Sequence, residues 1–286
     1  MGKIIKSPLR YPGGKSRAIS FLQAYFLPYF EEYREPFFGG GSVGIFISQI
    51  KQNITIKAND LNYDLYCFWT SLKKSPSSLI KTIRTMKERY QIGRDLYNFI
   101  LSRRHASLTE LQRGADFFIL NRITFSGVTD SGGYSQRAYE ERFTESSIDR
   151  LLQTHAVINN FTFDCADFSS LINEEGKNVF MFLDPPYYSA SKSKLYGKNG
   201  DLHSGFDHEE LLKCLQNTNH KFLLTYDDSD YIRQLYKDFY LLEWSLQYGM
   251  NNYKQLRAQK GKELLISNYP IKRYSCNDLY QYGLLL

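Results

Sequence analysis

An apolar run at residues 179–183 ends in Asp184-Pro185-Pro186-Tyr187. Five apolar residues between polar ones predict a buried strand. Two successive prolines fix their φ angles at about −65° and supply no N–H groups, which leaves rigid carbonyls with no local donor. In open α/β folds, a strand that ends in an acid delivers the carboxylate to the edge of the sheet where ligands bind. The run therefore predicts an α/β protein with a carboxylate at its ligand-binding edge.

The same four residues offer a matched set of acceptors. Asp184 has a carboxylate, Pro185 has a free carbonyl, and Tyr187 has an aromatic face. This set suits an exocyclic amino group on a flat ring, because the acid and the carbonyl can each accept one N–H while the tyrosine stacks on the ring. On these residues alone, an ordinary turn after a strand explains the pattern equally well, since Asp-Pro and Pro-Pro are frequent in loops.

A glycine-rich loop at residues 35–44 (EPFFGGGSVG) is the second pattern. It contains GxGxxG beginning at Gly39, and an apolar helix start follows it. A short strand at 54–56 then leads to Asp60, which lies 19 residues after Gly41. This is the spacing at which an acid binds a ribose diol in a βαβ nucleotide site. The ligands that fit are NAD, FAD and the adenosyl half of S-adenosylmethionine, and a structural glycine turn also fits.

The residues around the glycines favour one of these ligands. Glu35 would repel a pyrophosphate but attract the sulfonium and amino groups of S-adenosylmethionine. Near the N-terminus, Tyr11-Pro12-Gly13-Gly14-Lys15 forms a third pattern, a turn that could grip the carboxylate of an amino-acid-like ligand. Taken alone, this third pattern is explained better as a solvated turn.

Composition narrows the class of protein. The 286 residues contain no run of about 18 apolar residues, and the N-terminus is polar and basic, so we expect a cytoplasmic protein without a membrane partner. Four scattered cysteines and five histidines show no ligand spacing, which predicts reduced thiols and no metal. Residues 62–150 hold 14 lysines and arginines against 10 acids, within a net charge of +6. A basic middle segment indicates a polyanionic partner.

Together these patterns resemble the DNA adenine-N6 methyltransferases of the Dam group, the D12 class with the alpha order of motifs. Residues 11–15 are similar to their N-terminal cofactor motif, residues 35–44 to their glycine loop, and residues 184–187 to their catalytic DPPY motif. Further matches extend the resemblance over nearly the whole chain: 165–168 (CADF), 195–197 (LYG), 206–209 (FDHE), 225–229 (TYDDS) and 263–269 (ELLISNY).

The resemblance implies methyl transfer from S-adenosyl-L-methionine, without a metal, to the N6 amino group of adenine in a short sequence of double-stranded DNA. Because N6 is hidden in the duplex, the base must be flipped out. The catalytic residues that it implies are Asp184, Pro185, Pro186 and Tyr187. The cofactor-binding residues that it implies are Tyr11, Lys15, Glu35, Phe37, Gly39, Gly41, Asp60 (ribose), Asp167 and Phe168 (adenine), and Asp184.

The middle segment combines helices with one long loop. The pattern is helical from about 76 to 125, with Ser77 or Ser78 as one N-cap and Thr109 opening a later helix. In the resembling family, the loop at 121–134 forms a hairpin that enters the DNA groove. The residues we predict to contact DNA phosphates, wedge between bases or read base edges are Arg122, Phe125, Ser126, Asp130, Tyr134 and Arg137.

The hairpin also departs from the family. Members that read GATC carry a basic residue where this chain has Thr129-Asp130. An acid suits a cytosine amino group better than a guanine, so the sequence predicts a recognition site other than GATC.

We therefore expect a Rossmann-like, S-adenosylmethionine-dependent methyltransferase core with a mainly parallel seven-stranded sheet. The core spans residues 1–60 and 155–286, with a mostly helical target-recognition domain inserted at 61–154. Double-stranded DNA is the expected partner, a cognate restriction endonuclease is a candidate partner, and a monomer is favoured. A nicotinamide-dependent oxidoreductase would leave DPPY and the basic insert unexplained. A non-catalytic nucleic-acid-binding module would leave both cofactor patterns unexplained.

Overall fold

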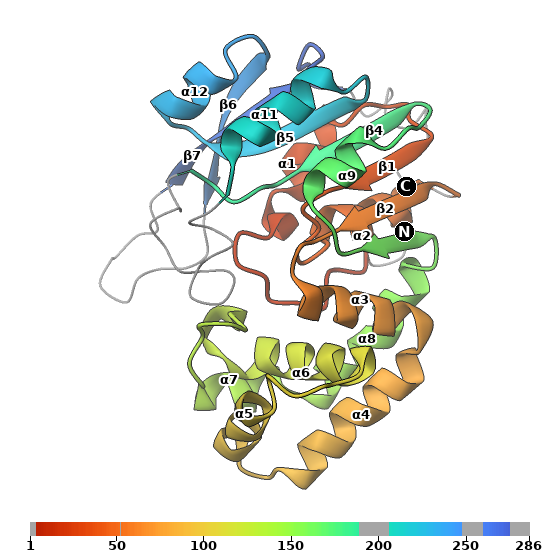
Figure 1. Cartoon of the computed structure of the whole chain (residues 1–286), viewed down its shortest axis with the longest axis vertical. Coiled ribbons are helices and arrows are strands. Elements are labelled where there is room, and N and C mark those ends of the chain that lie inside the picture. The colour runs from red at the N-terminus through yellow and green to blue at the C-terminus, as the bar shows by residue number, and fades with distance from the viewer. Residues whose placement is uncertain (1–3, 52, 189–205, 248–259, 275–286) are drawn as a thin grey trace.

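One sheet organises the molecule. The computed structural model describes residues 4–51, 53–188, 206–247 and 260–274, so the expected match at 195–197 lies outside the described residues. The sheet has seven strands in the order β3-β2-β1-β4-β5-β7-β6 (Figure 1). The strands are β1 (Glu32–Glu35), β2 (Thr55–Asn59), β3 (Phe161–Asp164), β4 (Val179–Leu183), β5 (Lys221–Asp227), β6 (Tyr240–Gln247) and β7 (Lys260–Ser267). Strands β1 to β5 are parallel, and β7 is antiparallel to β5 and β6, which confirms the predicted fold.

Helices cover both faces of this sheet. They are α1 (Ile19–Leu22), α2 (Ser42–Ile50), α9 (Phe168–Asn173), α11 (His208–Asn217) and α12 (Asp230–Leu235), with 3-10 turns at η1 (Lys15–Arg17) and η2 (Gln23–Tyr25). In the central strand β4, Phe180 and Phe182 pack in the cluster that holds α1 and α2. The alternate residues Val179, Met181 and Leu183 pack with α9, α11 and α12. All five are buried, as expected for a strand covered on both faces.

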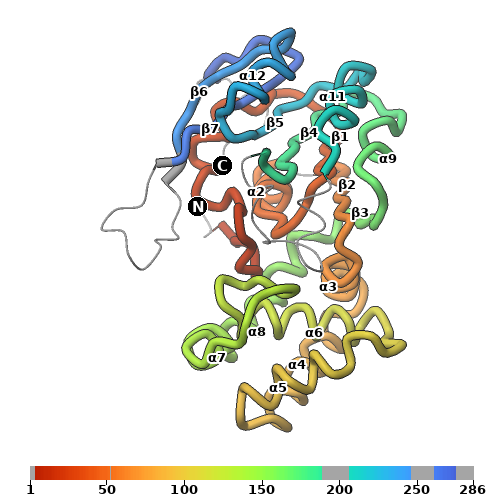
Figure 2. The backbone as a smooth tube through the Cα atoms, turned by 60° about the vertical axis from the view of Figure 1, so that its left-hand side comes forward, coloured from red at the N-terminus to blue at the C-terminus, as the bar shows by residue number. Residues whose placement is uncertain are grey.

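Six α-helices lie between β2 and β3 in the sequence. They are α3 (Tyr63–Lys74), α4 (Pro76–Arg89), α5 (Gly93–Ser102), α6 (Glu110–Ile123), α7 (Gln136–Arg142) and α8 (Glu145–Val157). They gather at one end of the molecule, below the sheet in Figures 1 and 2. Thr109 caps α6 in a capping box with Gln112, as predicted, whereas α4 begins at Pro76 after Ser75, because proline suits the first helical turn. The domain boundary at 61–154 stays a prediction. In the described part of the chain, no helix is long and apolar enough to cross a membrane.

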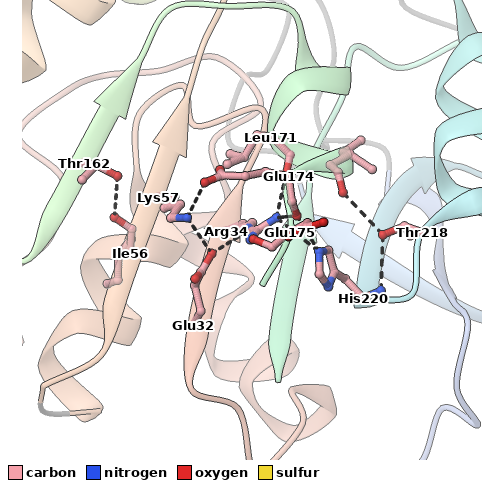
Figure 3. A network of polar contacts seen from close by, with 11 residues as sticks. Glu32, Arg34, Ile56, Lys57, Thr162, Leu171, Glu174, Glu175, Thr218 and His220 are labelled. Carbon is pink, nitrogen blue, oxygen red and sulfur yellow. Dashed lines mark hydrogen bonds and ion pairs between the residues drawn. The ribbon is translucent and has the colours of Figure 1, made fainter. Parts of the chain in front are cut away.

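A buried arginine ties β1 to the segment that follows α9. The Arg34 side chain is 0% exposed. Its Nη1 donates to the carbonyls of Leu171 at 2.9 Å and Glu174 at 2.6 Å. Its Nη2 donates to the carbonyl of Glu175 at 2.8 Å, and its Nε donates to the Glu32 carboxylate at 2.5 Å (Figure 3). One guanidinium thus satisfies three carbonyls of a segment that enters the central strand β4.

Replacing Arg34 with methionine keeps most of the side-chain volume and removes these donors. We expect the free energy of unfolding to fall by about 3–5 kcal/mol, because buried acceptors lose their partners. Urea-induced unfolding measures the change. The control is Lys213→Met on α11, which removes an exposed ion pair and should cost less than about 0.5 kcal/mol. Equal losses in the two variants would contradict this role for Arg34.

Candidate active site

A cavity of about 700 Å³ lies at the carboxyl ends of the parallel strands. The N-terminal turn, the glycine loop after β1, the acid after β2 and the turn after β4 all contribute to its wall. Parallel strands end at the same edge of a sheet, so segments far apart in the sequence converge there. The cavity is lined by every residue predicted to bind the cofactor or act in catalysis: Tyr11, Lys15, Glu35, Phe37, Gly39, Gly41, Asp60, Asp167, Phe168, Asp184, Pro185, Pro186 and Tyr187.

Asp184 is held on one side of its carboxylate. Its Oδ1 accepts a hydrogen bond from Lys15 Nζ at 2.6 Å and another from Thr225 Oγ1 at 2.8 Å. Lys15 is buried, and its Nζ also lies 4.8 Å from the centre of the Tyr187 ring. Among the described residues, no hydrogen bond reaches Oδ2. The second oxygen is therefore left for a donor that enters the cavity. Thr225 was not among the predicted site residues, although it begins the matched segment TYDDS.

The glycine loop adopts a shape that other residues would strain. Gly39 and Gly41 have φ angles of 49° and 66°. A Cβ atom on Gly39 would lie 2.7 Å from the Tyr11 ring. Asp60 fixes the loop, because its Oδ2 accepts from the Gly39 N–H at 2.8 Å while its Oδ1 accepts from the Asn62 N–H at 2.9 Å. The backbone can thus approach a ligand closely, and the position of Asp60 is set by the loop itself.

Three phenylalanines form one wall of the cavity. The ring centres of Phe37 and Phe168 are 5.4 Å apart, and Phe206 lies 5.6 Å from each of them. All three side chains keep part of their surface exposed. A flat heteroaromatic ring can stack or pack edge-on against such a wall. Phe206 was missed as a site residue, although it opens the matched segment FDHE.

Two buried acids also face the cavity. Glu35 Oε2 accepts from the Gly44 N–H at 2.9 Å and from the Tyr33 hydroxyl at 3.1 Å. Burial raises the pKa of Glu35 well above its ordinary value, although these two hydrogen bonds oppose the rise. Glu263, which is 1% exposed, accepts from the Tyr187 hydroxyl at 2.8 Å, and burial raises its pKa to about 7.

Acids outnumber bases around the cavity. Among the described residues, its lining holds two lysines, Lys15 and Lys262, and eight acids: Glu35, Asp60, Asp167, Asp184, Asp207, Glu210, Asp227 and Glu263. No group of histidines, cysteines and acids in the described ranges could hold a metal ion. This lining repels a pyrophosphate and favours a ligand with positive charge.

The predicted DNA hairpin follows α6 in the helical block. An isolated antiparallel bridge between Thr124 and Tyr134 closes it, and a 3-10 turn η3 (Phe125–Gly127) begins its loop directly after the bridge. Phe125 is 61% exposed. Ser126 has a φ of 55°, in the left-handed region that a serine rarely adopts. An exposed phenylalanine on a constrained turn is available to insert between bases.

Arg122 is more buried than the sequence suggested. It was predicted to contact DNA, yet it is only 5% exposed because α6 packs against its neighbours. Burial, together with the charges of Arg150, Arg10 and Arg142, lowers the pKa of Arg122 to about 9. Its Nε is buried and finds no hydrogen-bond partner among the described residues. Arg142 and Arg150 are exposed, so this arginine cluster reaches the surface at their side chains.

Two other predicted DNA residues are already engaged within the protein. Tyr134 is 7% exposed, and the Arg94 guanidinium lies 4.5 Å from the centre of its ring, so it forms part of the hairpin core rather than a base-reading surface. The Asp130 carboxylate forms an ion pair with Arg104 and is not an open acceptor for a cytosine amino group. Arg137 is exposed, and within the described residues its ion pair is with Glu141 on its own helix.

The raised pKa of Glu263 predicts a pH-dependent stability. Its ordinary pKa of 4.5 applies to the unfolded chain, and the folded value is about 7. Between these values the unfolded chain has lost the proton that the folded chain retains, so rising pH favours unfolding. Relative to Glu263→Gln, the wild-type protein should lose about 3 kcal/mol between about pH 4.5 and pH 7. Urea unfolding of both proteins across this range measures the difference, and a constant difference would contradict the assigned burial.

Comparison with known proteins agrees with this site. Residues 11–250 match the family model of the D12 class N6 adenine-specific DNA methyltransferases. The chain is 23% identical to the Type II methyltransferase M1.LlaDCHI of Lactococcus lactis subsp. cremoris, over 91% of this chain and 94% of that protein. It is 23% identical to the Type II methyltransferase M.MjaIII of Methanocaldococcus jannaschii, over 93% of this chain and 99% of that protein.

A phage protein extends the comparison. The DNA N-6-adenine-methyltransferase of Escherichia phage P1 is 26% identical over 82% of this chain, a region that spans 31% of the phage protein. The family match covers the N-terminal turn, the glycine loop, the helical block and the turn after β4. The chain therefore belongs to the D12 class of N6 adenine-specific DNA methyltransferases, enzymes that methylate adenine in DNA.

Proposed function

We propose that the cavity binds S-adenosyl-L-methionine and that the turn after β4 holds the target adenine while its N6 atom is methylated. The observation that carries this proposal is the state of Asp184. Lys15 and Thr225 both donate to Oδ1, and Asp184 lines the cavity with no hydrogen bond to Oδ2 from the described residues. A carboxylate oriented in this way can accept one N–H of an amino group without giving up the contacts that hold it.

The residues present fit this cofactor. Gly39 and Gly41 leave room where side chains would collide with Tyr11 and Phe38. The acidic lining suits the positive sulfonium and amino groups, and the phenylalanine wall suits the adenine. Asp60 would accept the ribose hydroxyls. When bound, S-adenosylmethionine supplies a methyl group on a positively charged sulfur, which is a good leaving group, so this chemistry needs no metal.

The exposed Asp167 is a weaker candidate for the adenine contact. Its Oδ1 already accepts from the Ser169 N–H at 2.9 Å and from the Ser169 hydroxyl at 2.5 Å, which caps α9. These bonds leave its second oxygen for the adenine amino group. Phe168 follows directly and contributes a ring to the wall.

The turn after β4 would make adenine N6 nucleophilic. The lone pair of this nitrogen is delocalised into the ring. Hydrogen bonds from its two N–H groups to Asp184 and to the Pro185 carbonyl draw the nitrogen toward tetrahedral geometry and localise the lone pair. Pro186 keeps the carbonyl rigid, and Tyr187 stacks on the base. Lys15 balances the negative charge of the Asp184 carboxylate while that carboxylate accepts the hydrogen bond from adenine N6. A base in a duplex reaches this site only if it is flipped out.

The helical block would supply the contacts to double-stranded DNA. Phe125 is the candidate wedge that fills the space left by the flipped base. The exposed members of the arginine cluster, Arg142 and Arg150, would bind a backbone phosphate, because an anion would offset the crowded charge around Arg122. Ser126 and Arg137 stay candidates for base-edge and phosphate contacts. A short recognition sequence other than GATC stays our proposal because Thr129-Asp130 lack the basic residue, although Asp130 itself is paired with Arg104.

We further propose that the enzyme acts as a monomer in the cytoplasm. A restriction endonuclease that cuts the same sequence is a candidate partner, because the relatives include Type II methyltransferases.

Asp184→Ala should abolish activity and preserve folding. We expect transfer of labelled methyl groups from S-adenosylmethionine to unmethylated genomic DNA to fall at least about 100-fold, because the lone pair is no longer localised. Binding of S-adenosylmethionine, measured by calorimetry, should persist. The control is Asp228→Ala, which removes an acid paired with Arg233 outside the cavity. Sequencing of the methylated DNA maps the modified adenines. Activity retained by Asp184→Ala would refute the assigned catalytic site.

Arg142→Met should weaken DNA binding in a salt-dependent way. Loss of one phosphate contact reduces the slope of log Kobs against log salt concentration by about 1. Fluorescence anisotropy with a labelled duplex, measured over a series of salt concentrations, gives the slope. Lys213→Met removes an equal charge from the surface of α11 and should leave the slope unchanged. An unchanged slope for Arg142→Met would show that this exposed arginine does not bind a DNA phosphate.

A further inference from the structure

Two acids on neighbouring antiparallel strands accept hydrogen bonds from the turn after β4. Asp227 at the end of β5 is the register partner of Glu263 near the start of β7. Both side chains are buried, with 8% and 1% exposure, and both line the cavity. Because β7 runs opposite to the other strands beside it, its beginning lies at the edge where β4 and β5 end. The reversed strand thus brings an acid to the edge that carries Asp184.

Each acid binds one of two consecutive tyrosines. Glu263 Oε2 accepts from the Tyr187 hydroxyl at 2.8 Å. Asp227 Oδ1 accepts from the Tyr188 backbone N–H at 2.8 Å. One contact fixes the far end of the Tyr187 side chain, and the other fixes the backbone that follows it. Together with the two prolines, they leave the Tyr187 ring little freedom to tilt.

We propose that Glu263 is a positioning residue for methyl transfer, which acts by holding the Tyr187 ring at the angle on which the target adenine stacks. The inference rests on the proposed site around Asp184. The Tyr187 hydroxyl is anchored, while the side chain keeps part of its surface exposed to the cavity. Such an arrangement presents one face of the Tyr187 ring to a ligand and prevents the ring from rotating when the ligand binds.

Stability alone gives a poor account of an acid at this position. A carboxylate loses its hydration on burial, and an apolar side chain of similar volume would fill the space without that cost. Burial is the main cause that raises the pKa of Glu263, and the charges of Asp184 and Asp227 add to the rise. The charge of Lys15 and the hydrogen bond from Tyr187 oppose it only in part. Burial and the two neighbouring acids make Glu263 unfavourable for folding, which is the pattern expected where a site is kept for function.

A double-mutant cycle tests the inference. Tyr187→Phe removes the hydroxyl and keeps the ring, and Glu263→Ala removes its acceptor. We expect each to lower kcat on unmethylated genomic DNA about tenfold, and the double variant to be no slower than either alone, because both break one hydrogen bond. Glu263→Gln keeps an acceptor and should stay within about threefold of the wild type. The matched control is Glu243→Ala on β6, an exposed acid paired with Arg233.

A fluorescence measurement separates positioning from structure. A duplex with the mapped recognition sequence carries 2-aminopurine in place of the target adenine, and this base is brighter when it is unstacked. The duplex bound to Tyr187→Phe or to Glu263→Ala should fluoresce about twofold more brightly than the duplex bound to the wild type, because the flipped base stacks less well. A loss of fold stability alone would lower the amount of active enzyme without changing the brightness of the bound base.

The outcomes distinguish the inference from the proposed site. If Asp184→Ala remains active, the site itself is wrongly assigned. If Asp184→Ala is inactive but Glu263→Ala and Tyr187→Phe keep the wild-type kcat, or their losses multiply to about 100-fold, Glu263 does not act through Tyr187. If Glu263→Ala does not fold, as judged by its melting curve, Tyr187→Phe and Glu263→Gln still decide. Wild-type brightness and kcat in Tyr187→Phe would then overturn the proposal.

Discussion

The parallel direction of five strands is the constraint on which the site depends. Four of them, β1, β2, β4 and β5, end at the cavity, so each contributes the residues that follow it. Glu35 ends β1, Asp60 follows β2, Asp184 follows β4, and Asp227 ends β5. None of these residues needs to be near another in the sequence. The reversed seventh strand adds its beginning to the same edge, which is why Glu263 faces the turn after β4.

Convergence of eight acids on the cavity brings like charges close together, and nearby groups of the protein offset part of their repulsion. Lys15 compensates Asp184, and backbone N–H groups compensate Asp60. Burial raises the pKa of Glu35 and of Glu263, although the charge of Lys15 opposes the rise at Glu263. This acidic lining attracts a ligand with positive charge more strongly than a neutral or negative one.

The sequence predicts the parts of the site that consist of consecutive residues. The turn after β4 and the glycine loop are such parts, because their backbone geometry follows from proline and glycine at fixed spacing. Thr225 and Glu263 could not be assigned roles in this way, since Glu263 meets Tyr187 across 76 residues and only the strand order joins them. The role of Phe206 could not be predicted for the same reason, because its ring partners, Phe37 and Phe168, come from other parts of the chain.

Burial in the helical block was the least predictable property. Arg122 and Tyr134 are residue types found on DNA-binding surfaces, yet Arg122 is buried on α6 and Tyr134 packs against Arg94 of α5. The sequence of a loop does not show which of its polar or aromatic side chains will be buried. The pairing of Asp130 with Arg104 joins this loop to the end of α5, and no local pattern reveals it.

One asparagine connects the loop after α6 to the N-terminal segment that leads to Lys15. Asn121 at the end of α6 accepts from the Arg10 backbone N–H at 3.0 Å and donates to the Arg10 carbonyl at 2.9 Å. Its Nδ2 also donates to the Gly127 carbonyl at 3.0 Å, within the 3-10 turn η3. Arg10 directly precedes the turn that carries Lys15 to Asp184. The turn that contains Phe125 is thus hydrogen-bonded through Asn121 to the segment that leads to Lys15. Asn121 therefore fixes the position of this part of the helical block relative to the lysine that pairs with Asp184.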